Sequence, residues 1–216
     1  MTTATPENPW NVRYRDAGDT YLFGTAPSQF LAQRAHLFEA GSSALLVADG
    51  EGRNSVYLAQ RGLTVTALDI SAIAVEKAKQ LALRNHVAIN SMVGDMMAPD
   101  WPPTDLHAAF DWVIGIFIQF TGADGRAQQL AAMQQLTRPG GRILLQGYTP
   151  KQLDYRTGGP SMLENLYTPA LLRTAFTGWE IEELVEYEAE LAEGAAHHGP
   201  SALIGLVARK PFSDPS

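Results

Sequence analysis

Short apolar runs alternate with amphipathic stretches through most of the chain. The runs typical of buried strands are Ala44–Ala48, Thr64–Leu68, Val87–Val93, Phe110–Ile116 and Arg142–Gln146. Helices are predicted from Ser28 through Ala40, over Arg53–Arg61, after Ser71 and around Asp124–Thr137. Strands that alternate with helices in this way predict a doubly wound α/β fold with a mostly parallel sheet.

The last part of the chain breaks this alternation. Glu180–Leu191 and Ala202–Arg209 both read as strands, and the residues between them, Glu193–Pro200, read as a loop rather than a helix. Two strands joined without a crossover helix pair antiparallel. The sheet is therefore expected to end in an antiparallel strand.

The join between the first two strands carries the clearest chemical signal. The first strand runs into Asp49-Gly50-Glu51-Gly52, a helix follows, and the second strand ends in Asp69. In a βαβ unit of this kind the glycines let the backbone approach a ligand, and the acid can bind ribose hydroxyls. The pattern predicts a site for an adenosine-type nucleotide.

Two ligands compete for that loop. Dinucleotide enzymes place a third small residue, glycine or alanine, where this chain has Ser55. Asp49 and Glu51 would repel a pyrophosphate, and Arg53 offsets only part of this repulsion. S-adenosylmethionine has no phosphate and carries a sulfonium and an ammonium, so an acidic loop favours it. An NAD-dependent oxidoreductase is the disfavoured alternative.

Composition narrows the class of protein. The 216 residues are expected to form one domain, 1–216, with an N-terminal segment over 1–40 and an α/β core over 41–210. The net charge of −7 argues against a general nucleic-acid binder. The chain has no cysteine, which excludes cysteine-based metal sites and an enzymic thiol nucleophile. Neither a secretory signal nor a long apolar run is visible, so we expect a cytoplasmic protein without a membrane partner.

Three segments together resemble a known family. GEGRNSVYLAQRG followed by VTALDIS, the N-terminal WNVRYRDAGDTYLFGTAPSQFL, and LTRPGGRILLQGY are similar to segments of class I S-adenosylmethionine-dependent methyltransferases. The first of them is most similar to the tellurite-resistance and thiopurine-methyltransferase-like group. The resemblance covers nearly the whole chain. It implies a Rossmann-like, seven-stranded sheet of order 3-2-1-4-5-7-6 with strand 7 antiparallel, and S-adenosylmethionine as the cofactor.

The resemblance also implies which residues contact the cofactor. Ribose hydroxyls would be bound by Asp69 and the adenine amino group by Asp95. The family's first loop usually carries an acid and a glycine where this chain has Leu46 and Ala48, so Asp49 is expected to supply the missing acid. In chain order, the expected cofactor-binding residues are Asp49, Gly50, Gly52, Asp69, Ile70, Asp95, Met96 and Ile116.

The acceptor side is less strongly specified. The exit of the fourth strand, Gly115-Ile116-Phe117-Ile118-Gln119-Phe120, lacks the Asp/Asn-Pro-Pro-aromatic signature of amino-methylating enzymes. An apolar floor with one amide fits a small, soft or weakly polar acceptor such as a thiol, selenium or tellurium species. The candidate substrate-pocket residues are Tyr21, Phe117 and Gln119.

Adjacent histidines lie before the last predicted strand. His197 and His198 are candidate catalytic residues because imidazole transfers protons near neutral pH, and Glu193 could orient one of them. Their spacing does not suit a metal pair on a helix, so no metal site is predicted, and an ordinary solvated loop is the competing interpretation. Two other functions stay open: a non-catalytic S-adenosylmethionine-binding protein and an O- or N-methyltransferase of a small metabolite. The oligomeric state is not indicated.

Overall fold

One twisted sheet organises the computed structural model, which describes residues 7–194 and 197–212. The strands are β1 (Ser43–Val47), β2 (Thr64–Asp69), β3 (Asn90–Val93), β4 (Phe110–Ile116), β5 (Thr137–Tyr148), β6 (Glu180–Glu193) and β7 (His197–Arg209). Their order is β3-β2-β1-β4-β5-β7-β6, and β7 is antiparallel to both of its neighbours. The fold and strand order expected from the sequence are confirmed.

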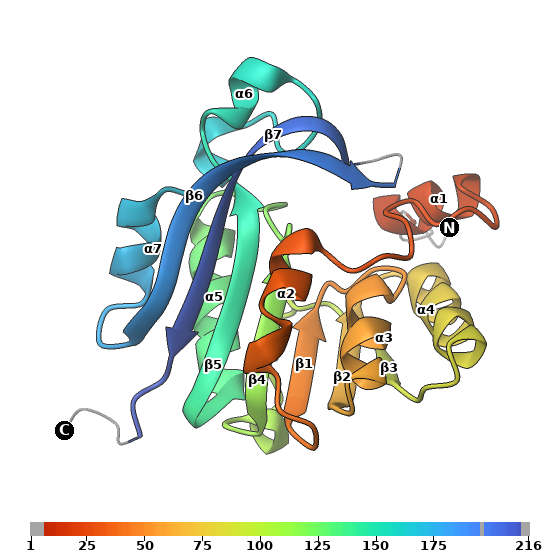
Figure 1. The fold of residues 1–216 in the computed structure, drawn as a ribbon, viewed down its shortest axis with the longest axis horizontal. Helices are drawn as coiled ribbons and strands as arrows, with labels where there is room; N and C mark the ends of the chain where they lie inside the picture. Colours follow the sequence, from red (N-terminus) through yellow and green to blue (C-terminus); the bar gives the residue numbers. More distant parts are fainter. Residues whose placement is uncertain (1–6, 195–196, 213–216) are drawn as a thin grey trace, which may run out of the picture.

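Helices cover both faces of this sheet (Figure 1). The helices are α1 (Pro9–Asp16), α2 (Gln29–Gln33), α3 (Arg53–Gln60), α4 (Ala72–Arg84), α5 (Ala123–Leu136), α6 (Gln152–Tyr155) and α7 (Pro169–Ala175). Short 3-10 turns occur at η1 (Ala35–Leu37), η2 (Thr104–Leu106) and η3 (Leu163–Asn165). No helix in the described part of the chain is long and apolar enough to cross a membrane.

Alternating side chains of the strands build two apolar cores. One core faces α5 and α7 and includes Leu45, Val113, Met133 and Leu172. The other faces α2 and α3 and includes Leu46, Ile114 and Leu58. Adjacent residues of one strand thus point into opposite cores, as the period of two requires.

The register of the parallel strands brings the carboxyl ends of β1, β2 and β4 to the same level. Val47 is level with Leu68 of β2 on one side and with Gly115 of β4 on the other. The loops that follow β1, β2 and β4 therefore leave the same edge of the sheet, next to the point where the chain order reverses. In open α/β sheets this switch point is where ligands bind.

Several predicted boundaries were wrong. The helix predicted from Ser28 through Ala40 ends at Gln33, and a 3-10 turn follows. Both C-terminal strands extend beyond their predicted bounds, β6 to Glu193 and β7 back to His197, so His197 and His198 lie in β7 rather than in a loop. The pairs Ala192–His198 and Glu193–His197 continue the β6–β7 ladder. Pairing between β6 and β7 keeps these polar residues in strands. The local hydrophobic pattern of the sequence does not reveal such pairing.

Candidate active site

A cavity of about 310 Å³ lies at the carboxyl ends of β1, β2 and β4. Helix α1 and the start of β7 complete its walls, and the β6–β7 end of the sheet reaches toward α1 above β1 and β2 (Figure 1). The cavity is within the size range of small-molecule sites. Of the residues expected at the site, those lining it are Asp49, Gly50, Asp69, Ile70, Asp95, Met96, Ile116, Phe117 and His197.

The two glycines of the first loop have different structural roles. Gly50 has φ +66°, and a Cβ there would lie 2.9 Å from the Tyr14 hydroxyl oxygen. Gly52 has φ +90°, and a Cβ would lie 2.7 Å from the Cβ of Ala78 in α4. Gly50 lines the cavity, whereas Gly52 does not. The structure therefore assigns Gly52 to the close packing of the loop against α4.

Asp69 fixes the shape of the loop from the end of β2. Its Oδ2 accepts from the Gly50 backbone N–H at 2.8 Å, and its Oδ1 accepts from the Ser71 N–H at 2.8 Å. Burial raises the pKa of this carboxyl, and the two backbone hydrogen bonds oppose the shift. The carboxylate thus joins β1 to β2 and still borders the cavity.

Asp49 is the second acid on the cavity wall. Its Oδ2 accepts from the Ser55 hydroxyl at 2.5 Å. Its Oδ1 is shielded from solvent and has no hydrogen-bond partner among the described residues. Burial raises the pKa of Asp49 to about 7, and the neighbouring charge of Asp69 adds to the shift. A buried, unpartnered carboxylate oxygen fits a cationic ligand such as S-adenosylmethionine.

Ile70 and Asp95 lie on the solvent side of the cavity, whereas Met96 lies on its inner side. Ile70 is 39% exposed, and Asp95 is exposed with its Oδ1 accepting from the Met97 N–H at 2.8 Å. Met96 is buried and packs into the core that faces α5. An exposed acid beside apolar side chains can bind the polar edge of a flat ring.

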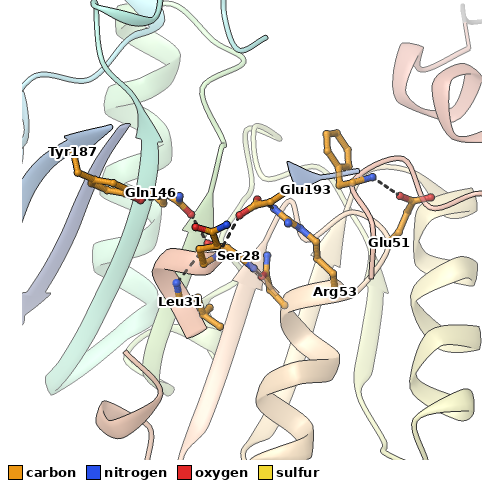
Figure 2. A network of polar contacts seen from close by, with 10 residues as sticks. Ser28, Leu31, Glu51, Arg53, Gln146, Tyr187 and Glu193 are labelled. Atoms are coloured by element: carbon orange, nitrogen blue, oxygen red, sulfur yellow. Dashed lines mark hydrogen bonds and ion pairs between the residues drawn. The ribbon is translucent and has the colours of Figure 1, made fainter. Parts of the chain in front are cut away.

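Two buried ion pairs join this loop to distant parts of the chain, and Figure 2 shows the residues of the second, Arg53 and Glu193. Glu51 pairs with Lys77 of α4 at 2.5 Å, and the Lys77 ammonium also donates to the backbone carbonyls of Gly18 and Thr20. Arg53 pairs with Glu193 of β6 at 2.7 Å. These contacts hold the N-terminal segment and the β6–β7 end against the cavity.

A network of hydrogen bonds anchors the start of α2 (Figure 2). The Ser28 N–H donates to Asn54 Oδ1 at 2.8 Å, and the Ser28 hydroxyl donates to the Gln146 side chain. Gln146 in turn donates to the Tyr187 hydroxyl at 3.0 Å. The Gln29 N–H donates to Glu193 at 3.2 Å, so α2 and the Arg53 ion pair share one acid.

An aromatic wall stands at the β4 exit. Phe117 has φ +57°, a conformation that a bulky side chain rarely adopts. Its ring stacks on Tyr148 at a centroid distance of 4.7 Å and meets the His197 ring edge-on at 4.3 Å. Phe23 of the N-terminal segment lies 4.8 Å from the same imidazole. His197 is thus enclosed by aromatic rings on the cavity wall.

Three expected substrate-side residues lie outside the cavity lining. Gln119 is buried, accepts from the Tyr148 N–H at 2.6 Å and donates to the carbonyls of Tyr148 and Asn165, so its amide joins the β4 exit to β5. Tyr21 donates to the Lys77 carbonyl at 3.0 Å on the outside of α4. His198 alternates with His197 along β7 and is exposed.

The expected role of Glu193 was also wrong. Its carboxylate is engaged by Arg53 and by the Gln29 N–H, and His197 Nδ1 has no hydrogen-bond partner among the described residues. Burial, followed by the positive charges of Arg53 and Arg13, lowers the pKa of His197 to about 3. The imidazole is neutral at physiological pH, and no described acid forms a hydrogen bond with its Nδ1.

Sequence reasoning missed several lining residues. Trp10, Tyr14 and Phe23 entered only as part of the N-terminal segment that resembles the family, and Arg53 only as a local charge. Phe120 follows the β4 exit and is 40% exposed at the cavity. The aromatic content of the N-terminal segment was the one available signal. Within the described residues, no group of three or more His, Cys, Asp or Glu side chains could hold a metal ion.

Part of the sequence matches a known protein family. Residues 44–141 match the family described as "Methyltransferase domain". Residues 44–141 are a methyltransferase domain. The strand order agrees with the class I fold that the sequence predicted, and the methyltransferase domain implies S-adenosylmethionine as the cofactor.

Individual relatives of the methyltransferase domain are distant. A tRNA 5-carboxymethoxyuridine methyltransferase of Escherichia coli K12 is 33% identical over 123 residues, covering 52% of this chain and 43% of the relative. The chain thus matches less than half the length of that curated relative.

Two solved structures share the fold over most of this chain. TehB from Haemophilus influenzae superposes with a TM-score of 0.68 at 18% identity, covering 93% of this chain and 67% of TehB. A structure described as "Conversion of a Disulfide Bond into a Thioacetal Group during Echinomycin Biosynthesis" gives 0.74 at 18% identity, covering 96% and 95%. At these identities the likeness concerns the fold alone.

Proposed function

We propose that this protein transfers the methyl group of S-adenosylmethionine to a small-molecule acceptor with a soft nucleophilic atom. The observation that carries the proposal is the lining of one cavity. Asp49, Asp69 and Asp95, at or just after the ends of β1, β2 and β3, supply its acidic half, and Phe117 and His197, from the β4 exit and the start of β7, supply its aromatic half. A cationic donor fits the acidic half, and its methyl group would face the aromatic half.

The residues of the acidic half have distinct proposed roles. Asp69 binds the ribose hydroxyls, Asp95 accepts from the adenine amino group, and Ile70 packs on the ring. Asp49 faces the cationic methionine portion with its unpartnered oxygen. The backbone of Gly50 lies against the same portion, since no side chain intervenes.

The aromatic half favours a small acceptor. The whole cavity is at the lower end of the range for small-molecule sites, so a bound cofactor leaves limited space. Methyl transfer is an in-line displacement, and its rate depends mainly on holding the nucleophile and the methyl group in line. The ring of Phe117, its aromatic neighbours and the neutral His197 would position the acceptor and exclude water. They would not take up a proton.

The similarity to a tRNA methyltransferase raises a second acceptor class. Nucleic-acid binding normally requires a basic surface, and the chain has a net charge of −7. We therefore favour a small acceptor and a cytoplasmic site of action. A non-catalytic domain that binds S-adenosylmethionine is the remaining alternative.

The test separates binding from turnover. Calorimetry first measures the affinity of the protein for S-adenosylmethionine and, separately, for NAD. We expect only S-adenosylmethionine to bind. Formation of S-adenosylhomocysteine is then followed with thiols, selenite, tellurite, phenols, small amines and bulk tRNA as acceptors. Product with thiols or chalcogen compounds supports the proposal.

The other outcomes are equally informative. Turnover confined to tRNA would replace the small acceptor with a nucleic acid. Tight cofactor binding without product from any acceptor class would favour the non-catalytic alternative. Preferential binding of NAD would refute the proposed function altogether.

A further inference from the structure

Phe117 has an uncommon backbone conformation at the point where β4 runs into the cavity wall. Its φ of +57° is one that bulky side chains rarely adopt. Strain of this kind persists only where the surrounding structure fixes it, and it is concentrated at functional sites. The ring of Phe117 lines the cavity and stacks on Tyr148. The contacts that fix Phe117 therefore determine the shape of the aromatic half.

The ladder between β4 and β5 ends immediately before Phe117. Ile116 and Gln146 form its last pair, and the Phe117 N–H then donates to the Gln146 carbonyl at 2.8 Å. β5 continues to Tyr148, beyond the point where β4 pairs with it. Because the directions of backbone groups alternate along a strand, Tyr148 presents its N–H and carbonyl to the same side as Gln146. These two groups need partners that the β4 backbone does not supply.

The side chain of Gln119 supplies those partners. Its Oε1 accepts from the Tyr148 N–H at 2.6 Å, and its Nε2 donates to the Tyr148 carbonyl at 2.9 Å. The same carbonyl also accepts from the Tyr167 N–H at 3.0 Å. A neighbouring strand would offer Tyr148 the same two kinds of group, a carbonyl and an N–H. The amide thus replaces one step of the ladder while the β4 backbone turns away at Phe117.

A glycine makes room for this amide on β5. A Cβ at Gly147 would lie 2.6 Å from the Gln119 Oε1, so a larger residue there would displace the amide. The Nε2 of Gln119 also donates to the Asn165 carbonyl at 3.0 Å, which joins η3 to the same group. Gln119 is 5% exposed, so water competes little for these hydrogen bonds. An apolar side chain in its place would leave the Tyr148 N–H buried without this partner.

We propose that Gln119 is a positioning residue for methyl transfer: its amide holds the β4 exit against Tyr148 and so fixes the ring of Phe117 in the cavity wall. This inference rests on the proposed function, in which that wall aligns the acceptor with the methyl group. Gln119 is not among the residues that line the cavity, so it acts through Phe117. Because the rate depends on alignment, a displaced ring lowers kcat more than it weakens cofactor binding.

A double-mutant cycle tests whether Gln119 acts through Phe117. Gln119→Met keeps the length of the side chain without its hydrogen bonds, Phe117→Leu removes the ring, and the third variant combines the two. Gln119→Glu, which keeps an acceptor for the Tyr148 N–H, takes the place of Gln119→Met if that variant does not fold. Methyl transfer to thiophenol is measured below the melting temperature of every variant. Calorimetry with S-adenosylmethionine gives the cofactor affinity and the fraction of folded protein.

Gln152→Met is the matched control. Gln152 is also a buried glutamine with three hydrogen bonds, which go to Thr157, Gly158 and Ala202, and it lies outside the cavity lining. Its replacement should lower the stability of the protein as the loss of a buried amide does, but it should change kcat less than about threefold.

We expect kcat to fall roughly 10- to 100-fold in Gln119→Met, while the affinity for S-adenosylmethionine changes less than about threefold. In the Phe117→Leu background the same substitution should change kcat less than about threefold, because the ring that it displaces is already absent. An unchanged kcat in Gln119→Met, or losses that multiply in full in the double variant, would overturn the inference and leave the proposed function intact.

A spectroscopic measurement needs no acceptor and so separates this inference from the proposed function. The ring of His197 meets that of Phe117 edge-on at a centroid distance of 4.3 Å, so its NMR signals depend on where the Phe117 ring lies. Carbon–proton spectra of the histidine side chains are recorded with S-adenosylhomocysteine bound, and His197→Phe assigns the signal. It should shift in Gln119→Met and stay in place in Gln152→Met. An unmoved signal refutes the positioning role even where thiophenol is methylated. A shifted signal without turnover supports that role and counts against the proposed acceptor class.

Discussion

Replacing Asp49 by asparagine should stabilise the cofactor-free protein, and the gain should grow with pH. Burial is the main reason that the pKa of Asp49 rises from 3.8 to about 7. The side-chain oxygen of asparagine can still accept from the Ser55 hydroxyl, as the Asp49 carboxylate does. The substitution therefore removes the ionisable group while preserving its local contact.

The magnitude follows from proton linkage. Between the unfolded pKa of about 3.9 and the folded pKa of about 7, the folded chain holds one more proton than the unfolded chain. The free energy of unfolding thus falls by about 1.4 kcal/mol per pH unit in this window. The full penalty, reached above pH 7, is about 4 kcal/mol, of which about 2 kcal/mol develops between pH 5 and pH 7.

Urea denaturation at a series of pH values from 5 to 8 measures the effect. The stability difference between Asp49→Asn and wild type should increase to about pH 7 and then level off. Asp111→Asn is the matched control: the pKa of Asp111 is lowered, so its contribution is constant over this range. An Asp49→Asn difference that is the same at pH 5 and pH 8 would refute a buried acid at this position.

Three further substitutions test other parts of the site. Glu193→Gln leaves the Arg53 guanidinium unpaired and should lower the free energy of unfolding by about 3–5 kcal/mol in urea melts, whereas Glu188→Gln, in an exposed pair, should change it little. Gly52→Ala should cost at least about 1 kcal/mol more than Gly178→Ala, because both have positive φ but only the former meets another side chain; equal losses would contradict the packing role. Asp69→Ala should weaken calorimetric binding of S-adenosylmethionine by about 1.5–3 kcal/mol, and unchanged affinity would reject the ribose contact.

Local sequence signals predicted the parts of the fold that local chemistry determines. The helix predicted after Ser71 is α4, and the Ser71 side chain caps it by accepting from the Ala74 N–H at 3.2 Å. The glycine loop and Asp69 lie together because a βαβ unit brings successive strand ends to one edge. The full strand order depended on the family resemblance, because hydrophobic periodicity does not specify which strands pair.

Contacts between distant residues account for what was missed. The pairing of Arg53 with Glu193 spans most of the chain, and neither residue signals it locally. Gln119 was predicted to line the substrate pocket because it follows an apolar strand. Its polar atoms instead form hydrogen bonds with three backbone groups of β5 and η3. His197 and His198 both lie in β7, so their side chains point to opposite faces of the sheet, and only His197 lines the cavity. The sequence alone could not tell which of the two would do so.

The shifted acid of the first loop explains the charge preference of the cavity. Leu46 is buried in the core that faces α2, so the position at which the family usually has an acid contributes only packing here. Asp49 instead places its carboxyl beside Asp69, and each of the two acids has a raised pKa. Two neighbouring carboxyls resist ionising together unless a cation lies between them. Binding a sulfonium or ammonium would relieve that repulsion, whereas a pyrophosphate would add to it, so we expect this loop to favour S-adenosylmethionine over a dinucleotide.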